Sequence, residues 1–239
     1  MTALKIIILT TDTPHHLYFA WKLRECFSIE GILLETKSLQ APFDIFHAFE
    51  AQRDAYERDH LLAGFGSSFG ELADTKSIES LNTPDACKTI SSFKPDIAIV
   101  FGTSRLSLPI IRLPSVACLN LHGGNPEMYR GLDSQLWAIY HNDFANLATT
   151  LHYVAVGLDT GDIVANTRLL LTRETRLHEL RSINTRACAV LSVRALSCLE
   201  STGRLSARPQ LQRGRYYSFM PSVLKEDCLR KFQRHVSKL

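Results

Sequence analysis

The stretch SVACLNLHGGNPEMYRG, residues 115–131, passes from an apolar run into a turn rich in polar residues and glycine. The apolar part predicts a strand over Ser115–Leu121. Because side chains alternate along a strand, Asn120 and His122 lie on one face where that strand ends. Ligands of open α/β sheets bind at the carboxyl edge of the strands, so this end of the strand is a candidate site.

Two observations support a functional interpretation of this strand end. An amide beside an imidazole can stabilise negative charge that develops on a carbonyl oxygen. Gly123 and Gly124 leave the backbone uncovered, which permits close approach by a ligand. The alternative is structural, since polar residues at strand ends often satisfy only the hydrogen bonds of the turn.

Apolar strands alternate with helices on both sides of this stretch. The predicted strands cover Lys5–Leu9, Gly31–Glu35, Pro95–Val100, Ser115–Leu121, Thr149–Val154 and Ile163–Leu171. The predicted helices begin at Pro14 and then cover Phe43–His60, Pro84–Phe93, part of Phe101–Arg112, Gly131–Tyr140 and Thr175–Leu199. This alternation predicts an α/β fold built on a doubly wound, mostly parallel sheet.

Three further expectations concern the organisation of the chain. The Gly/Ser-rich segment Leu61–Gly70 is expected to be a mobile loop. Residues 205–239 break the alternation with a basic loop, an edge strand over Tyr216–Met220 and a terminal helix, so we expect a domain over 1–203 and a tail over 204–239. The inner face of the long helix is expected to carry Leu177, Leu180, Ile183, Ala187, Val190, Leu191 and Leu199.

The composition excludes several classes of protein. The 239 residues carry a net charge of +3, which is too small to indicate binding to nucleic acid. No apolar run has the roughly 18 residues of a membrane span, and the N-terminus lacks the pattern of a signal peptide. The six cysteines are scattered without a CxxC pair, so we expect reduced thiols in a cytoplasmic protein. The two familiar phosphate loops are absent, as are GxSxG and HExxH.

A second polar loop, GLDTGDI at Gly157–Ile163, holds Asp159 and Asp162. Read alone it is an ordinary tight turn, and it lacks the further ligands that a metal site would need, so no metal is expected. Together with Asn120 and His122 the loop supplies an amide, an imidazole and a carboxylate. That set predicts a reaction at a carbonyl group without a covalent nucleophile.

At these residues the chain resembles the folate-dependent formyltransferases. The shared features, in order, are Asn120–Leu121–His122, Pro126, Tyr129–Arg130–Gly131, Trp137, Thr150–Leu151–His152 and Leu158–Asp159–Thr160–Gly161–Asp162. The resemblance implies the Rossmann-like core of that family and N10-formyltetrahydrofolate as the formyl donor. It also implies a catalytic trio of Asn120, His122 and Asp159, in which the first two hold an oxyanion. Asp159 would help to remove the proton of the attacking amine and keep His122 charged.

The resemblance also implies where the two substrates lie. The residues expected to contact folate are Gly102, Arg105, Leu106, Gly157, Leu158 and Asp162. Those expected to contact the acceptor are Gly123, Gly124, Arg130, His152, Asp12 and His15. Several have structural alternatives: Asp12 or Thr13 can cap the first helix, Arg130 can be a solvated turn residue, and His152 can be a core histidine.

Three departures from the family pattern bear on the acceptor. Gly124 replaces a common Ser, Ala155–Val156 replace an acidic residue, and about 35 tail residues are too few for the oligonucleotide-binding barrel of methionyl-tRNA formyltransferase. The ending YYSFMPS…KEDCLRKF is similar to the dimerisation tails of sugar-nucleotide N-formyltransferases. We therefore expect a homodimer acting on a nucleotide-linked amino sugar, a 4-amino-4,6-dideoxy sugar such as GDP-perosamine, for O-antigen and lipopolysaccharide synthesis.

Other functions remain open on the sequence alone. The same core could use water as acceptor and act as a formyltetrahydrofolate hydrolase. It could also be a non-catalytic sensor of folate or nucleotide, or a transformylase of glycinamide ribonucleotide. Formylation of an added amino-sugar nucleotide would distinguish the expected activity from these alternatives.

Overall fold

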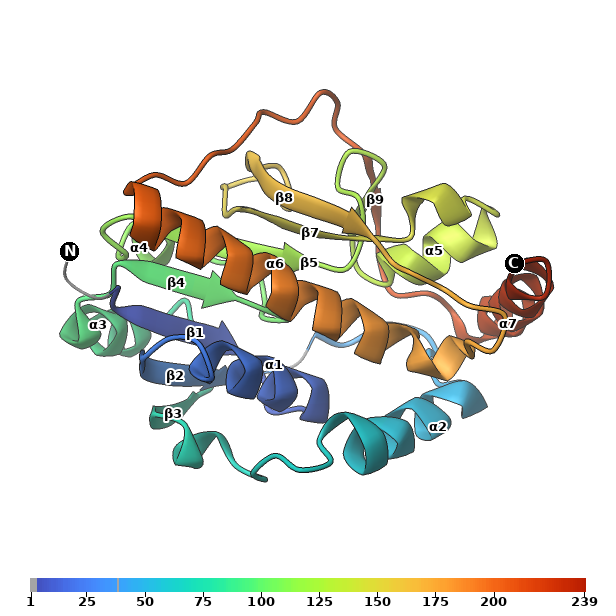
Figure 1. Ribbon diagram of the computed structural model, residues 1–239, viewed down its shortest axis with the longest axis horizontal. Helices are drawn as coiled ribbons and strands as arrows, with labels where there is room; N and C mark the ends of the chain where they lie inside the picture. Colours follow the sequence, from blue (N-terminus) through green and yellow to red (C-terminus); the bar gives the residue numbers. More distant parts are fainter. Residues whose placement is uncertain (1–3, 38) are drawn as a thin grey trace.

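The computed structural model describes residues 4–37 and 39–239, and a seven-stranded sheet forms its centre (Figure 1). The strand order is β3-β2-β1-β4-β5-β7-β8, and only β7 runs against the others. The strands are β1 Ile6–Thr10, β2 Ile29–Glu35, β3 Asp74–Ile78, β4 Ile97–Val100, β5 Ala117–His122, β7 Ala148–Tyr153 and β8 Ile163–Arg168. The predicted α/β fold with a mostly parallel sheet is confirmed.

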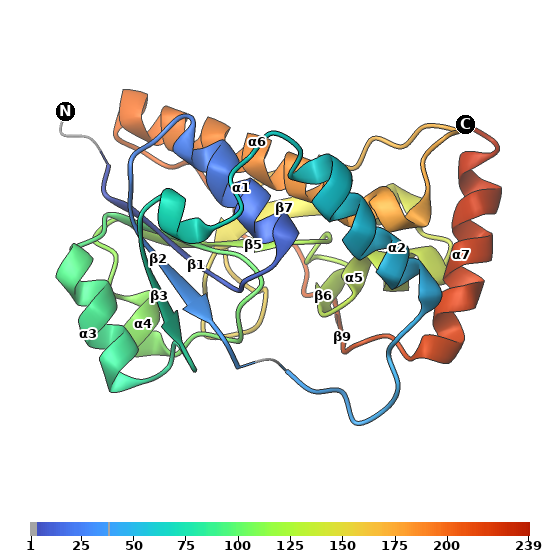
Figure 2. The ribbon, with the colours of Figure 1, turned by 90° about the horizontal axis from the view of Figure 1, so that it is seen from below.

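Helices cover both faces of this sheet. They are α1 Pro14–Arg24, α2 Ala48–Tyr56, α3 Pro84–Phe93, α4 Leu108–Ile111, α5 Ser134–Tyr140, α6 Leu180–Thr202 and α7 Ser222–Val236. A π-helical turn, η1 Glu57–Leu61, continues α2, and single 3₁₀ turns lie at Phe69–Glu71 (η2), Phe144–Asn146 (η3) and Leu177–Glu179 (η4). Figure 2 shows α1 and α6 on one face of the sheet, with α3 and α4 on the other.

The central strand shows why the sheet needs helices on both sides. Side chains of a strand alternate between faces, and every residue of β1 is apolar except Thr10. Ile6 and Ile8 pack with α1 and α6, whereas Ile7 and Leu9 pack with α3 and α4. All four are fully buried, as expected for a strand covered on both faces.

Some predicted elements are wrong in position. The helix expected over Phe43–His60 begins only at Ala48, where the His47 side chain accepts a hydrogen bond from Phe49 N and caps it. In α6 the expected inner-face residue Val190 is exposed. Within Leu61–Gly70, expected to be a mobile loop, Leu61 and Phe69 are buried; the predicted mobility stays a prediction.

Two strands of the structure were not expected from sequence. Strand β3 is an edge strand with the polar sequence DTKSI, and half-exposed edge strands lack the apolar signal of central ones. Strand β6, Tyr129–Gly131, pairs in parallel with β9, Arg215–Tyr217, to form a separate two-stranded sheet. The tail strand expected over Tyr216–Met220 is therefore shorter and pairs with the turn after β5 instead of the main sheet.

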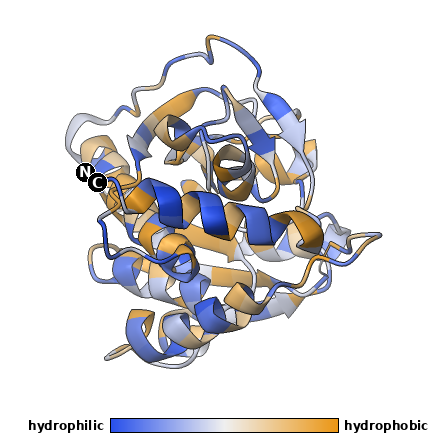
Figure 3. Ribbon diagram, turned by 90° about the vertical axis from the view of Figure 1, so that its right-hand side faces the viewer, coloured by the Kyte–Doolittle hydropathy of each residue, from blue (hydrophilic) through white to orange (hydrophobic). Residues whose placement is uncertain are grey.

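The tail is anchored by its own hydrophobic contacts. Cys228, Phe232 and Val236 recur at helical spacing along α7 and are buried in a cluster with residues of α5, η4 and α6. Figure 3 shows the side of the molecule where α7 lies, and the helices on this side carry both hydrophilic and hydrophobic residues. The boundary expected near residue 203 stays a prediction, but one apolar cluster spans it.

We expect Phe232→Ala to lower the free energy of unfolding by about 3–5 kcal/mol, because the ring is fully buried and its loss leaves a cavity. Chemical denaturation followed by circular dichroism measures the change. Val223→Ala on the same helix serves as control, since Val223 is 81% exposed. Two separate transitions in the Phe232→Ala protein would contradict the shared cluster.

Candidate active site

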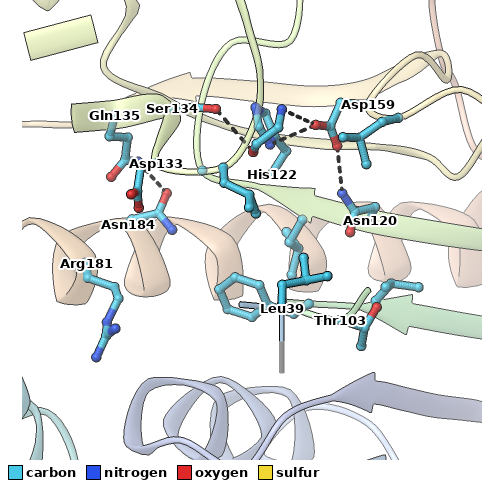
Figure 4. A pocket seen from close by; sticks show the side chains of 18 of the residues that line it. Leu39, Thr103, Asn120, His122, Asp133, Ser134, Gln135, Asp159, Arg181 and Asn184 are labelled. Atoms are coloured by element: carbon cyan, nitrogen blue, oxygen red, sulfur yellow. Dashed lines mark hydrogen bonds and ion pairs between the residues drawn. The ribbon is translucent and has the colours of Figure 1, made fainter. Parts of the chain in front are cut away.

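A cavity of about 760 Å³ opens at the carboxyl ends of β4 and β5 (Figure 4). Its walls include the β4–α4 loop, the end of β5, the β7–β8 loop and the first turns of α6, together with residues of α1, α2 and α5. Asn120, His122, His152 and Asp159 all line it. The predicted position at the sheet edge is therefore where the structure places these residues.

Asp159 is the buried centre of the polar cluster. Its backbone has φ 51°, a left-handed conformation that Asp tolerates better than most residues. Oδ2 accepts a hydrogen bond from Gly131 N at 2.8 Å and lies 3.6 Å from His122 Nδ1. Oδ1 lies 3.5 Å from Asn120 Nδ2 and 3.6 Å from His152 Nε2. The three residues of the expected trio thus meet around one carboxylate.

The charge of this carboxylate follows from its surroundings. Burial raises the pKa of Asp159, but its electrostatic interaction with His122, the neighbouring His152 and the Gly131 N–H together hold it well below its usual range. Asp159 is therefore an anion at neutral pH. Its contribution to folding stability is present above the ordinary carboxyl pKa and is lost as the pH falls below about 4.

The ring of His122 is held at both nitrogens. Nε2 lies 2.8 Å from the carbonyl oxygen of Tyr129, which can only accept, so Nε2 carries a hydrogen and donates it. Nδ1 faces Asp159, so a second proton on the ring would point at the carboxylate. The ring is 6% exposed, and neither nitrogen is aimed at open space as it stands.

The side-chain amide of Asn120 is also held by hydrogen bonds within the cluster. Its Nδ2 is 3.1 Å from His152 Nε2, whose other nitrogen lies 2.8 Å from the Tyr153 carbonyl oxygen. Nδ1 of His152 therefore carries the hydrogen, and Nε2 accepts from Asn120. Figure 4 shows the amide nitrogen of Asn120 toward Asp159 and its oxygen away from it. Both hydrogens of Nδ2 are thus directed at His152 and Asp159, so donation to a substrate oxygen requires the amide to turn away from one of them.

The residues expected at folate form one wall of the cavity. Gly102, Arg105, Leu106, Gly157 and Leu158 all line it. Gly102 has φ 77°, and a Cβ there would stand 2.3 Å from the His16 ring, so the loop needs glycine at this position. An uncovered backbone beside an apolar wall suits a flat heterocycle with hydrogen-bonding edges, so the residues fit a pterin.

Two polar side chains hold this loop from outside the cavity. Buried Glu35, at the end of β2, accepts from Ser104 N at 2.6 Å and from Ser104 Oγ at 2.8 Å. Asn82 donates to Arg105 O at 2.9 Å and accepts from Ser107 N at 2.6 Å. These residues carry no sequence signal, because their partners lie far away along the chain.

Four of the predicted binding residues do not line the cavity: Asp12, Gly124, Arg130 and Asp162. Asp12 and Asp162 are exposed, and neither Asp12 nor Thr13 makes a side-chain cap for α1. Gly124 is buried, and a Cβ there would lie 2.9 Å from His122 Nε2 and from Ser134 Cβ. Since that space is already filled, the missing Ser does not open room for an acceptor.

Arg130 instead links the β7–β8 loop, which holds Asp159, to the tail. It donates to the carbonyl oxygens of Leu158 at 3.1 Å and Gly214 at 2.7 Å. Gln210, also in the tail, donates to the carbonyls of Asp159 at 2.9 Å and Gly161 at 2.8 Å. The strap between α6 and β9, which arches over β8 in Figure 1, therefore holds the backbone around Asp159.

Three polar side chains of the wall formed by α5 and α6 were not predicted from the sequence: Gln135, Arg181 and Asn184. Gln135 Nε2 donates to Asn184 Oδ1 at 2.8 Å, and Thr149 Oγ1 donates to the same oxygen. Arg181 lies one helical turn before Asn184. On α5 and α6 no motif marks these residues as functional, so only the tertiary fold shows that they line a cavity.

His15 and His16 form another buried part of the wall. Burial lowers the pKa of His15 well below its usual range, helped by the charge of Arg181, and burial with the neighbouring His15 does the same for His16. His16 Nδ1 lies 3.1 Å from the Thr11 carbonyl oxygen, so it carries the hydrogen of a neutral ring.

These two histidines predict acid sensitivity. Below pH 6.5 the unfolded chain binds protons there that the folded chain does not, so the free energy of unfolding falls as the pH falls. The slope is up to about 1.4 kcal/mol per pH unit for each such proton. Urea titrations between about pH 7 and pH 5.5 measure it. His16→Gln should reduce the slope, whereas His60→Gln, at an exposed position, should not; equal slopes in all three proteins would refute the assignment.

Other features of the described chain are simpler. No helix in the described residues is both long enough and apolar enough to cross a bilayer. The same residues contain no group of three or more His, Cys, Asp or Glu placed to hold a metal ion. All six cysteines, which lie in the described part, are unpaired, and Cys26 and Cys198 are exposed.

Comparison with known proteins places this fold and site in a family. Residues 47–188, more than half of the chain, match the profile of the formyl transferase family, so the chain belongs to that family. Methionyl-tRNA formyltransferase of Methylacidiphilum infernorum is 29% identical over 156 residues, which are 63% of this chain and 46% of that protein. The chain therefore spans less than half of the length of this relative.

Solved structures show the same fold at low sequence identity. A 4-N formyltransferase of Francisella tularensis has a TM-score of 0.61 at 13% identity, with 91% of this chain and 77% of that chain covered. HypX of Aquifex aeolicus, in complex with tetrahydrofolic acid, has a TM-score of 0.58 at 17% identity and coverages of 94% and 31%. The formyltransferase PseJ of Anoxybacillus kamchatkensis, in complex with UDP-4,6-dideoxy-4-formamido-L-AltNAc and tetrahydrofolate, has a TM-score of 0.52 at 17% identity and coverages of 89% and 85%.

Proposed function

We propose that this protein transfers a formyl group from N10-formyltetrahydrofolate to the amine of a nucleotide-linked amino sugar. The observation that carries the proposal is the meeting of Asn120, His122 and His152 around the buried carboxylate of Asp159, at the wall of one cavity. The folds shared with a 4-N formyltransferase and with PseJ agree with an amino-sugar acceptor.

The donor supplies an activated formyl carbon, and the residues of this chain arrange its transfer. The amine attacks that carbon, the bond to N10 breaks, and tetrahydrofolate leaves with a proton on N10. The turned amide of Asn120 donates to the formyl oxygen, and a protonated His122 ring would stabilise the negative charge there through its own charge, because both of its nitrogens already have partners. Asp159 keeps the His122 ring oriented and offsets its positive charge.

The low pKa of Asp159 also limits its role as a base. A carboxylate whose pKa lies well below the ordinary range accepts a proton only transiently. We therefore propose that Asp159 receives the amine's proton, directly or through water, and that this proton or one from solvent protonates N10 as tetrahydrofolate leaves. Folate would lie against Gly102–Leu106 and Gly157–Leu158, which leaves the α5–α6 wall for the acceptor.

The proposal extends to the identity of the sugar, the pathway and compartment in which it is used, and the oligomeric state. We propose a 4-amino-4,6-dideoxy sugar, with GDP-perosamine as the first to test, used for O-antigen in the cytoplasm. We also propose a homodimer formed through the tail, with folate and the sugar nucleotide as the small-molecule partners and no metal. Size-exclusion chromatography with light scattering tests the dimer.

Mass spectrometry tests the activity. Purified protein is incubated with N10-formyltetrahydrofolate and a panel of GDP-, dTDP- and UDP-linked amino sugars, with glycinamide ribonucleotide and methionyl-tRNA as rival acceptors. The expected result is the mass gain of one formyl group on an amino-sugar nucleotide. Loss of donor without any acceptor would indicate a hydrolase, and tight folate binding without turnover would indicate a sensor.

A further inference from the structure

Two arginines line the cavity on the side away from the folate loop: Arg53 on α2 and Arg181 on α6. Figure 4 shows Arg181 extending from α6 on the opposite side of the cavity from Thr103, which belongs to the folate loop. Neither arginine belongs to the catalytic cluster around Asp159.

Arg181 is held in one orientation by an acid behind it. Glu57 is fully buried and accepts from Arg181 Nε at 2.6 Å and from Nη2 at 2.6 Å. Nη2 also donates to Asp54 Oδ1 at 2.9 Å. The hydrogen bonds of the described residues leave Nη1 for another partner. Such a fixed guanidinium loses little side-chain freedom when it binds a ligand.

The backbone that supplies Glu57 is itself unusual. Glu57 begins the π-helical turn η1, which follows α2 directly. Short π-helical turns inside helices occur often at functional sites, because the wider turn redirects side chains. Here the turn places a carboxylate underneath an arginine of the cavity wall.

Like Arg181, Arg53 is held by neighbouring carboxylates. Its Nε donates to Asp54 Oδ1 at 2.9 Å and its Nη1 to Glu50 Oε1 at 3.2 Å, which leaves Nη2. The two side chains are 20% and 29% exposed, for Arg53 and Arg181. Among the residues that the structure describes, Glu50, Asp54 and Glu57 do not line the cavity. Both arginines therefore line the cavity, whereas the carboxylates that bind them do not.

We propose that Arg53 and Arg181 bind a phosphate or diphosphate group of the acceptor, so that the acceptor is an amine carried on a phosphate ester. The inference rests on the proposed formyl transfer and names the part of the acceptor that this end of the cavity recognises. Guanidinium groups match phosphate oxygens in geometry and keep their charge throughout the ordinary pH range. The neighbouring His15 and His16 are neutral because burial lowers their pKa, so they add no positive charge beside the two arginines.

Calorimetric titration with inorganic pyrophosphate and with GDP tests the site directly. Wild-type protein is expected to bind both, and Arg53→Gln and Arg181→Gln are each expected to raise Kd about 10- to 100-fold, as for loss of a charged hydrogen bond. Arg181→Lys keeps a positive charge beside buried Glu57, so this variant tests the site if Arg181→Gln fails to fold. Arg186→Gln, exposed on the same helix, is the control and should match wild type.

Kinetics separate this inference from the proposed function. In formylation of an amino-sugar nucleotide, Arg53→Gln should raise the acceptor KM about 10-fold or more and leave kcat within about twofold. Formylation with the same KM in Arg53→Gln and wild type would overturn the phosphate site and leave formyl transfer intact. Pyrophosphate binding that is lost in the variants without any formyl transfer would overturn the proposed function alone. Succinate binding as tightly as pyrophosphate would show a carboxylate site and refute the phosphate assignment.

Discussion

Asp159→Asn is expected to lower kcat for formyl transfer by about 10³- to 10⁴-fold, with the fold retained. The amide that replaces the carboxylate has one oxygen for the Gly131 N–H and for Asn120, and its nitrogen cannot accept from either. The negative charge beside His122 Nδ1 also disappears, so a protonated ring loses its partner. The effect therefore falls on the reacting state more than on substrate binding.

Single-turnover kinetics with saturating donor and acceptor measure this loss. Asp85→Asn is a suitable control, because Asp85 is exposed on α3 and does not line the cavity. A folded Asp159→Asn protein with a kcat within tenfold of wild type would remove Asp159 from the catalytic trio. A parallel thermal-unfolding measurement distinguishes loss of chemistry from loss of fold.

Asn120→Ala is expected to reduce kcat by about 10²- to 10³-fold, the usual effect of removing one donor to a developing oxyanion. The variant also frees His152 Nε2 and one oxygen of Asp159, so the free energy of unfolding should fall by about 1 kcal/mol. The contrast between a large kinetic and a small thermodynamic effect is the informative result.

The reorientation of the Asn120 amide can be measured separately. Nuclear magnetic resonance of the side-chain NH₂ should show a change of environment when a folate analogue and an acceptor analogue are both bound. Asn166→Ala is the matched control, since Asn166 lies on β8 outside the cavity and donates to Thr150 Oγ1. Unchanged turnover in Asn120→Ala would refute its role as an oxyanion donor.

Local patterns in the sequence predicted most of the fold because its central strands are continuous apolar runs. β1 and β4 are buried on both faces, and this double burial leaves an unmistakable run of Ile, Leu, Val and Ala. Edge strand β3 has one neighbour and little apolar content, so local pattern could not show it. The pairing of β6 with β9 joins Arg130 to Tyr216, and no local rule connects residues so far apart.

Local sequence patterns likewise predicted some residues of the candidate site and missed others. Asn120, His122 and Asp159 follow directly from strand ends and a loop, and the structure brings them together. Arg130 has the right residue type for a ligand contact, but its Nε and Nη1 donate to two carbonyl groups and it does not line the cavity. Gln210, Glu35 and Arg181 act on the site through partners distant in sequence, so their positions become visible only in three dimensions.

The hydrogen bonds from Gln210 and Arg130 have a consequence for engineering and for comparison among relatives. A chimaera that kept residues 1–203 and took its ending from another family member would exchange Gln210, one of the supports beneath Asp159, and the Gly214 carbonyl that orients Arg130. Replacing the tail is therefore expected to shift the backbone around Asp159, even though the tail contains none of Asn120, His122 and Asp159.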